Sequence, residues 1–290
     1  MTEIRFVRTR HFYESYQDFF RLVELSGFET IFVDELDISK EGVYIVCPMN
    51  GEWRTHIDNQ YGKIINAHLI LWNLERPASA GGTIGAVPLY GIQNRELLYG
   101  RWEDGRRARM NFVNEVWVSD RHLADNTQLR FVILGSDEGL GEPGEEKHFD
   151  FCHMSNEIPR RTGVYSKFKL SSIGPNSWGQ ERNDVLRASR FGLNIHQDTY
   201  NFQEPLRFAL FAAYGLPIIS EDLFDMYPWA SEYMMTAILD ELPWRLRQAF
   251  DEDYGPYREM GLRARERMTG EFRFKTMVEQ AVKESVGRWR

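Results

Sequence analysis

The chain has 290 residues, of which 42% are hydrophobic and 14% aromatic, and its formal net charge is −8. This composition supports two packed cores and argues against disorder, and the negative charge argues against a protein that coats nucleic acid, although a local basic groove is not excluded. Cys47 and Cys152 lie outside any CxxC or Cys/His cluster, so neither a disulfide framework nor a zinc site is expected. No signal-like or membrane-spanning apolar run is present, which predicts a cytoplasmic protein without stable membrane insertion.

The first half of the chain alternates short apolar runs with helical or loop segments. Residues 4–9 ("IRFVRT") predict a strand, and residues 16–28 ("YQDFFRLVELSGF") predict an amphipathic helix that ends at Gly27. Further strands are predicted at 30–36, 43–49, 68–74, 115–119 and 130–135. Several of these runs are apolar at almost every position, which is typical of a parallel sheet covered by helices on both faces.

A polar, glycine-rich and acidic stretch follows at residues 135–148 ("GSDEGLGEPGEEKH"). This composition favours a linker between two domains, and a surface loop inside one domain is the alternative. The α/β pattern then restarts, with strands predicted at 148–155, 170–175, 191–196 and 216–221 and helices at 160–168, 182–190 and 205–215. From about residue 229 onward the sequence predicts helix alone.

We therefore predict an α/β protein with two Rossmann-like domains facing across a cleft, followed by C-terminal helices. The N-terminal domain is placed at residues 1–145 and the C-terminal domain at residues 146–270. Open α/β sheets bind their ligands at the carboxyl ends of the strands. A ligand site is accordingly expected where the strand ends of the two domains meet.

Residues 201–221 ("NFQEPLRFALFAAYGLPIISE") place Glu204 and Arg207 at the start of an apolar helix. Pro205 suits the first helical position, because the N–H that it lacks has no helical partner there, and Gly215 is a natural end. The free N–H groups and the dipole of such a helix attract an anion such as a diphosphate, to which Arg207 could add a charge-assisted bond. Ordinary capping at Glu204, with an Arg207 that reaches from a packed helix to solvent, is the alternative.

The same stretch resembles the donor-binding segment of GT-B glycosyltransferases. In the retaining group 1 enzymes that segment has an acidic residue, Gly-Phe-Gly, a helix and Ala-Ala-Gly-x-Pro-Val, and "EPLRFALFAAYGLPIISE" follows this shape. It is nearer still to the spore-maturation-type glycosyltransferases, in which an arginine occupies the first helical turn. Three further pieces agree in order, "NEVWVSDRHLADN…LRFVILGSDEG", "FDFCHMSNEIPRR" and "GLRARERMTGEFRFKTMVEQAV", so the resemblance covers about residues 105 to 285.

The resemblance implies transfer of a sugar from a nucleotide-diphosphate donor, UDP- or GDP-linked, to a glycan, a small molecule or a modified nucleic acid. It implies neither a cofactor nor a metal, because this fold generally stabilises the leaving diphosphate with a helix dipole and cations. It also implies that the last helix, residues 271–290, crosses back to the first domain. The positions that would bind the donor are Arg160, Arg161, Lys167, Glu204, Pro205, Leu206 and Arg207. Of the two adjacent arginines, one is expected to face the site and the other to face solvent.

Two further side chains are candidates for catalysis. His196 ends the predicted strand at 191–196, where a histidine can contact a ligand or cap the sheet. Glu75, in "LILWNLERP", ends an apolar strand of the first domain and could orient the acceptor or take its proton, with a salt bridge to Arg76 as the alternative.

The sequence departs from the family pattern at two places. The glycine pair that the family usually has near the first strand is absent, and "RTRHFYESY" stands there instead. The second glutamate of the family, which usually holds the nucleotide ribose, corresponds to Leu210, and Glu221 or Asp198 are the candidates to replace it. Three alternatives therefore stand beside a glycosyltransferase in general: a nucleotide-sugar epimerase of the same fold, a non-catalytic nucleotide-sugar binding protein, and a phage-type DNA-base glycosyltransferase. In the last, residues 101–110 ("RWEDGRRARM") would contact phosphates.

Overall fold

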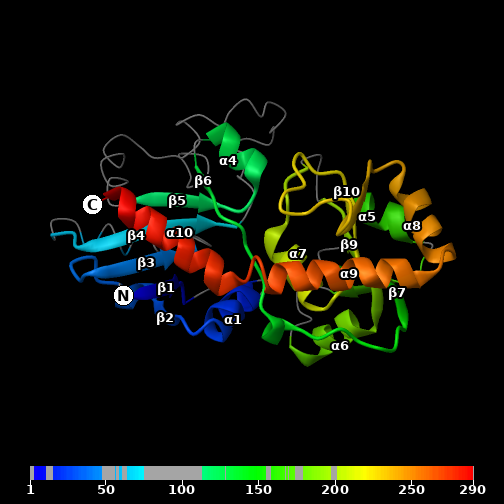
Figure 1. The fold of residues 1–290 in the computed structure, drawn as a ribbon, viewed down its shortest axis with the longest axis horizontal. Coiled ribbons are helices and arrows are strands. Elements are labelled where there is room, and N and C mark those ends of the chain that lie inside the picture. Colours follow the sequence, from blue (N-terminus) through cyan, green and yellow to red (C-terminus); the bar gives the residue numbers. More distant parts are fainter. Residues whose placement is uncertain are drawn as a thin grey trace. The chain divides into compact units, whose positions relative to one another are not determined.

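The protein is described by a computed structural model, which contains two compact α/β units (Figure 1). The residues that it describes are 3–10, 16–47, 56, 59–60, 64–74, 113–127, 129–154, 158–166, 168, 170–173, 179–196 and 201–289. Unit 1 comprises Met1–Ile133 and Lys275–Arg290, and unit 2 comprises Leu134–Phe274. None of the helices in these described ranges is both long enough and apolar enough to cross a membrane.

Unit 1 is built on a six-stranded sheet in which all recorded strand pairs are parallel. The strand order is β2-β1-β3-β4-β5-β6. The strands are β1 (Ile4–Arg8), β2 (Glu29–Phe32), β3 (Gly42–Val46), β4 (Ala67–Asn73), β5 (Glu115–Val118) and β6 (Arg130–Phe131). The helical elements between them in the described ranges are α1 (Gln17–Leu25), the 3₁₀ turn η2 (Val33–Glu35) and α4 (Arg121–Thr127).

The central strands of unit 1 are buried on both faces, as their apolar runs predicted. All five residues of β3 are buried, and in β4 only His68 is partly exposed. Helix α1 covers the sheet with Phe19, whose ring meets Trp72 of β4 edge to face at 5.7 Å. The helix ends at Leu25, and Gly27, with a φ of 74°, follows the C-cap residue Ser26, so the predicted stop at this glycine is confirmed.

Helix α10 (Phe274–Trp289) closes unit 1 and packs on the sheet beside β4, β5 and β6 (Figure 1). The ring of His68 on β4 lies 2.9 Å from the hydroxyl of Ser285. Arg130 on β6 donates to the backbone oxygen of Ala281 at 2.8 Å, and Glu115 on β5 pairs with Arg288. Polar contacts thus hold the last helix to the sheet of the unit that begins the chain.

Unit 2 has a five-stranded parallel sheet in the order β11-β10-β9-β7-β8. In chain order this is the doubly wound arrangement 2-1-3-4-5, whose switch point lies between β7 and β9. The strands are β7 (Phe149–Met154), β8 (Leu170–Ile173), β9 (Ser189–Asn194), β10 (Ile218–Glu221) and β11 (Met234–Ala237). The helical elements are η4 (Glu138–Leu140), α5 (Pro159–Tyr165), α6 (Gln180–Ala188), α7 (Pro205–Ala213), α8 (Leu242–Asp251) and α9 (Tyr254–Thr269).

Strand β9 sends alternate side chains to opposite faces of the unit 2 sheet. Phe191, Leu193 and Ile195 belong to a buried apolar cluster that also contains residues of α5 and α8. Gly192 lies on the other face, where a Cβ would come within 2.6 Å of the Phe211 ring of α7. Because this position carries no side chain, α7 can lie close against β9.

Helix α7 is covered on several sides, which explains why its residues are apolar nearly all round. Besides the sheet, the segment 135–148 contacts it, since the hydroxyl of Ser136 donates to the backbone oxygen of Ala209 at 3.0 Å. Helix α9 contacts the C-terminal end of α7, where Arg265 of α9 donates to the backbone oxygen of Ala213. The glycine-rich segment 135–148, predicted as a linker, therefore lies within unit 2 and covers this helix.

Three details differ from the expectations drawn from the sequence. The region after residue 229 is not all helical, because Met234–Ala237 forms β11, which pairs in parallel with β10. The strand predicted at 130–135 ends at Phe131. The strand predicted at 30–36 ends at Phe32, whose N–H donates to the carboxylate of Glu35 across η2 at 2.7 Å.

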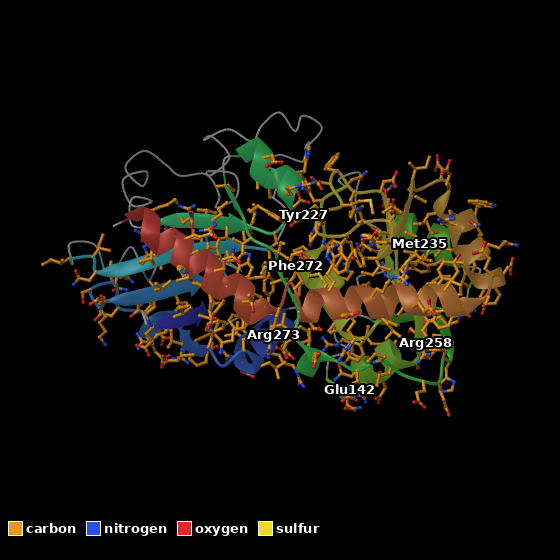
Figure 2. The ribbon with its side chains drawn as sticks, viewed as in Figure 1. Glu142, Tyr227, Met235, Arg258, Phe272 and Arg273 are labelled. Atoms are coloured by element: carbon orange, nitrogen blue, oxygen red, sulfur yellow. The ribbon has the colours of Figure 1, made fainter. Side chains whose placement is uncertain are left out.

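The segment between α9 and α10 is held inside unit 2. The rings of Tyr227 and Phe272 meet edge to face, and Arg273 pairs with Asp137 at 3.1 Å (Figure 2). A Cβ at Gly135 would lie 1.6 Å from the backbone oxygen of Phe272, so the two chain segments run in direct backbone contact there.

Candidate functional site

The carboxyl edge of the unit 2 sheet gathers charged and polar side chains from β9, β10, α5 and α7. We call this set the polar cluster, and its members are Arg160, Arg161, Asn194, His196, Glu204, Arg207, Ser220 and Glu221. It adjoins the carboxyl end of β9, one of the two strands that form the switch point, where doubly wound sheets bind their ligands.

Helix α7 presents its N-terminus to this cluster, and no side chain in the described part of the chain caps it. Glu204 is the N-cap residue and Pro205 follows it, as predicted, and no side-chain cap bond is recorded. The first bond of the helix runs from the N–H of Phe208 to the oxygen of Glu204 at 3.0 Å. The N–H groups of Leu206 and Arg207 precede that bond, so they have no partner within the helix and are suited to an anion.

Arg207 turns back from α7 onto strand β9 instead of reaching outward. Its Nη1 donates to the amide oxygen of Asn194, and the same nitrogen lies 3.8 Å from the Glu204 carboxylate. Its side chain is only 12% exposed. The alternative of an arginine that extends from a packed helix into solvent is therefore wrong.

The adjacent arginines on α5 are both engaged at this edge. Arg160 pairs with Glu221 of β10, and Nε of Arg161 donates to the backbone oxygen of Ile195 at 3.0 Å. Arg161 is 3% exposed. The expectation that one of the two would face solvent is wrong, because the first turn of α5 lies directly beside the ends of β9 and β10.

His196 follows β9 and is 3% exposed. Its backbone N–H donates to the Glu221 carboxylate at 3.2 Å, whereas its Nε2 is buried without a hydrogen-bond partner among the described residues. Burial lowers the pKa of His196 to about 4, and nearby Arg207 and Arg160 act in the same direction against Glu204. The imidazole is therefore neutral near pH 7, with one nitrogen left for a ligand.

Burial also shifts the pKa values of two other ionisable groups at this edge of the sheet. Burial lowers the pKa of His153 well below its usual value, and the charges of Arg207 and Arg161 add to this. Burial raises the pKa of Glu221, against the attraction of Arg160. Ionisable groups whose pKa values are shifted by burial and that cluster at one edge of a sheet are typical of ligand sites.

Several predicted positions lie outside the described residues. They are Glu75, Lys167, Asp198 and the arginine-rich segment 101–110. Within the described ranges, no group of three His, Cys, Asp or Glu side chains has an arrangement that could hold a metal ion.

The sequence did not single out three members of this neighbourhood. Asn194 and Ser220 are neighbours across β9 and β10, with 2.9 Å between the amide nitrogen and the hydroxyl. His153 lies one residue before the end of β7, and its ring packs at 5.3 Å from that of Tyr165. The available signal was a polar side chain at the end of an apolar strand, which the histidine of "FDFCHM" and the asparagine of "FGLNIH" both give.

Sequence comparison finds no matching family model. An uncharacterized protein of Acanthamoeba polyphaga mimivirus is 29% identical over 82 residues, which make up 26% of this chain and 27% of that protein. The chain thus matches only about a quarter of the length of this relative.

Comparison of structures gives likenesses over nearly the whole chain. AviGT4, a glycosyltransferase involved in avilamycin A biosynthesis, is similar with a TM-score of 0.59 and 10% identity over 98% of this chain and 97% of that one. HepE of Anabaena in complex with UDP has a TM-score of 0.58 at 8% identity, over 97% and 100%. The DNA-modifying enzyme β-glucosyltransferase has a TM-score of 0.52 at 10% identity, over 98% and 99%. The chain therefore has the GT-B fold, with two Rossmann-like units, as its sequence predicted.

Proposed function

We propose that this protein is a glycosyltransferase that takes a sugar from a nucleotide-diphosphate donor. The observation that carries the proposal is the N-terminus of α7, which no described side chain caps and which lies with Arg207 at the carboxyl edge of the sheet. Beside it is the buried Nε2 of His196, which has no hydrogen-bond partner in the described part of the chain. The three structural relatives with this fold support it, since two are named glycosyltransferases or glucosyltransferases and the third was solved with UDP.

In this proposal the N-terminus of α7 binds the diphosphate of the donor. The N–H groups of Leu206 and Arg207 and the helix dipole stabilise the negative charge that grows on the diphosphate as the sugar leaves. The guanidinium of Arg207 adds a charge that is already oriented by Asn194. Arg160, which pairs with Glu221, is the second cation of the site.

The neutral His196 and the carboxylate of Glu204 are assigned to the sugar. Nε2 of His196 is buried without a partner among the described residues, so a hydroxyl of the sugar would complete its hydrogen bonding. Glu204 is about one-third exposed at the start of α7 and can accept from sugar hydroxyls. Glu75 and Lys167 remain candidates for acceptor activation and for the diphosphate.

We further propose a UDP- or GDP-linked donor, no cofactor, no requirement for a divalent ion, and a cytoplasmic location. The HepE structures with UDP and with UDP-glucose favour a uridine nucleotide. The acceptor is a glycan, a small molecule or a modified nucleic acid.

Thermal unfolding with UDP-, GDP-, ADP- and TDP-sugars tests the donor. A ligand that binds only the folded state at 100 times its dissociation constant stabilises it by ~2.7 kcal/mol. We expect one nucleotide class to raise the melting temperature and to release its sugar to an acceptor panel. Consumption of the donor to an isomeric sugar nucleotide would identify an epimerase, and binding without turnover would identify a non-catalytic binder.

A second candidate is a glycosyltransferase that acts on DNA bases, and the likeness to the DNA-modifying β-glucosyltransferase favours it. The net charge of −8 weighs against it. Binding of duplex DNA that weakens steeply with salt, measured by fluorescence anisotropy, is the result expected of such an enzyme. Absence of binding at low salt would eliminate it.

A further inference from the structure

The side chain of Asn194 joins helix α7 to strand β10. Its amide oxygen accepts from Nη1 of Arg207, and its amide nitrogen donates to the hydroxyl of Ser220 at 2.9 Å. That hydroxyl in turn donates to the backbone oxygen of Glu221 at 2.6 Å. Asn194 and Ser220 are both fully buried, so water does not compete for these bonds.

The direction of every bond in this chain is forced. A guanidinium only donates, so the oxygen of the Asn194 amide has to face Arg207 and its nitrogen has to face Ser220. The hydroxyl of Ser220 accepts there and uses its one hydrogen for the backbone of Glu221. The amide therefore has one orientation in which all partners are satisfied. The guanidinium sets that orientation, and the hydroxyl of Ser220, whose hydrogen is used on Glu221, holds the amide nitrogen in place.

The strand geometry explains why Asn194 can reach Arg207. Gly192 and Asn194 are two residues apart on β9, so they share the face toward α7. The missing side chain at Gly192 brings α7 close, with the Phe211 ring where a Cβ would be. Arg207, in the first turn of α7, is then within hydrogen-bond reach of Asn194.

Asn194 engages one end of the guanidinium and leaves the rest available. Among the described residues, Nη1 donates to the Asn194 oxygen and lies 3.8 Å from the Glu204 carboxylate. No described residue accepts from Nε or Nη2 of Arg207. The backbone N–H of the same residue precedes the first bond of the helix and has no partner within it, so side chain and backbone can serve the same anion.

We propose that Asn194, locked by Ser220, is a positioning residue that orients Arg207 toward the diphosphate of the donor. The inference rests on the proposed function. It adds Asn194 to the donor site as a residue that acts only through the side chain of Arg207. Its distinctive consequence is that loss of Asn194 should weaken diphosphate binding only while Arg207 is present.

The test is a double-mutant cycle read by calorimetric titration with inorganic pyrophosphate, UDP-glucose and GDP-mannose. We expect Asn194→Leu to weaken binding roughly 10-fold and Ser220→Ala about 3-fold, because a hydrogen bond to a charged group is lost or loosened. In the Arg207→Ala background neither change should have a further effect. Ser189→Ala is the matched control, since Ser189 is an equally buried serine at the other end of β9, bonded to the backbone oxygen of Val185 at 2.7 Å.

Each outcome separates the inference from the proposed function. If Asn194→Leu does not fold, Ser220→Ala carries the same cycle, and equal losses with and without Arg207 overturn the inference. The protein could bind pyrophosphate with the expected coupling between Asn194 and Arg207, but bind neither sugar nucleotide. This result would support the positioning role and count against the donor assignment. A wild-type protein that binds none of the three probes overturns both.

Discussion

Glu204 is the N-cap residue of α7 and Arg207 lies in its first turn, but the two residues are expected to affect binding differently. Arg207→Ala should weaken binding of the nucleoside diphosphate roughly 10- to 150-fold, because a charged hydrogen bond contributes ~1.5–3 kcal/mol. Glu204→Gln should weaken binding of the sugar nucleotide more than that of the free nucleoside diphosphate, since Glu204 is assigned to the sugar. Calorimetric titration of both ligands measures the two effects.

A melting curve for each variant distinguishes a ligand role from a packing role. If Arg207 only supports the fold through Asn194, its alanine variant should melt at a lower temperature and still bind normally. A well-folded Arg207→Ala protein with unchanged affinity would remove Arg207 from the site.

The buried imidazole of His196 predicts a loss of stability in acid. An unfolded histidine binds a proton near pH 6.5, whereas His196 in the folded protein binds one only near pH 4, so between these values the unfolded state holds more protons. Stability is therefore retained above pH 6.5 and falls as the pH drops toward 4, by up to about 3 kcal/mol from this residue. Urea unfolding at several pH values gives the free energy of unfolding of the wild type and of His196→Gln. The difference between the two proteins measures the contribution of His196. Parallel pH profiles would contradict the burial argument.

At the scale of elements, the packing of α9 against the end of α7 depends on Gly261. A Cβ there would lie 2.3 Å from the backbone oxygen of Gly215 and 2.6 Å from the nitrogen of Pro217. Gly261→Ala should therefore destabilise the protein by about 1–3 kcal/mol, although alanine favours helix. Gly287→Ala in α10 is the matched control, because nothing lies within 4 Å of its Cβ position, and it should stabilise by up to ~1 kcal/mol. If urea unfolding shows that both substitutions change the free energy of unfolding in the same direction, this packing argument is wrong.

Helix α10 should be required for the stability of unit 1. Val278, Ala281 and Val282 of the part of α10 that belongs to unit 1 are buried, and each fully buried large apolar side chain contributes ~1.5–3 kcal/mol. Deleting residues from 272 onward should therefore lower the melting temperature strongly, and Val278→Ala should do so in part. The exposed neighbour Glu279→Ala serves as the control. A truncated chain that melts like the full one would refute the packing.

The elements that the sequence predicted are those with strong local signals. Helix α7 combines Pro205 at its start with Gly215 after its end, and both positions were predicted correctly. Strand β11 was missed because its sequence, "MMTA", has one β-branched residue and three that favour helix. Pairing with β10 and burial of Met234 override that preference, and neither is visible in a local window.

At the scale of the whole molecule, turnover is expected without a divalent ion. In the proposed mechanism the charge on the leaving diphosphate is stabilised by a helix terminus and by arginines, which chelators do not remove. Activity should be unchanged in EDTA and should not increase with Mg²⁺ or Mn²⁺. Loss of turnover in EDTA that Mn²⁺ restores would show that a metal ion takes part.

The site could be predicted in part because its pieces lie in recognisable motifs. Arg160, Glu204 and Arg207 follow strands or begin helices, where sequence reasoning looks for ligand-binding residues. The bonds between them depend on strand order, because only the insertion of β9 between β7 and β10 brings Asn194 beside Ser220. That order comes from tertiary packing, so the partners of Arg207 could not be read from spacing.

The return of α10 to the first unit has a consequence for biosynthesis. Unit 2 is one continuous segment, whereas unit 1 needs residues from both ends of the chain. On a ribosome that adds ~5–20 residues per second, the nascent sheet of unit 1 waits on the order of ten to thirty seconds for its last helix. During that time the surface that includes His68 of β4 lacks its cover, while unit 2 can fold completely. Unit 2 can thus complete its fold before unit 1 does, and we expect the uncovered sheet of unit 1 to bind a chaperone during that interval.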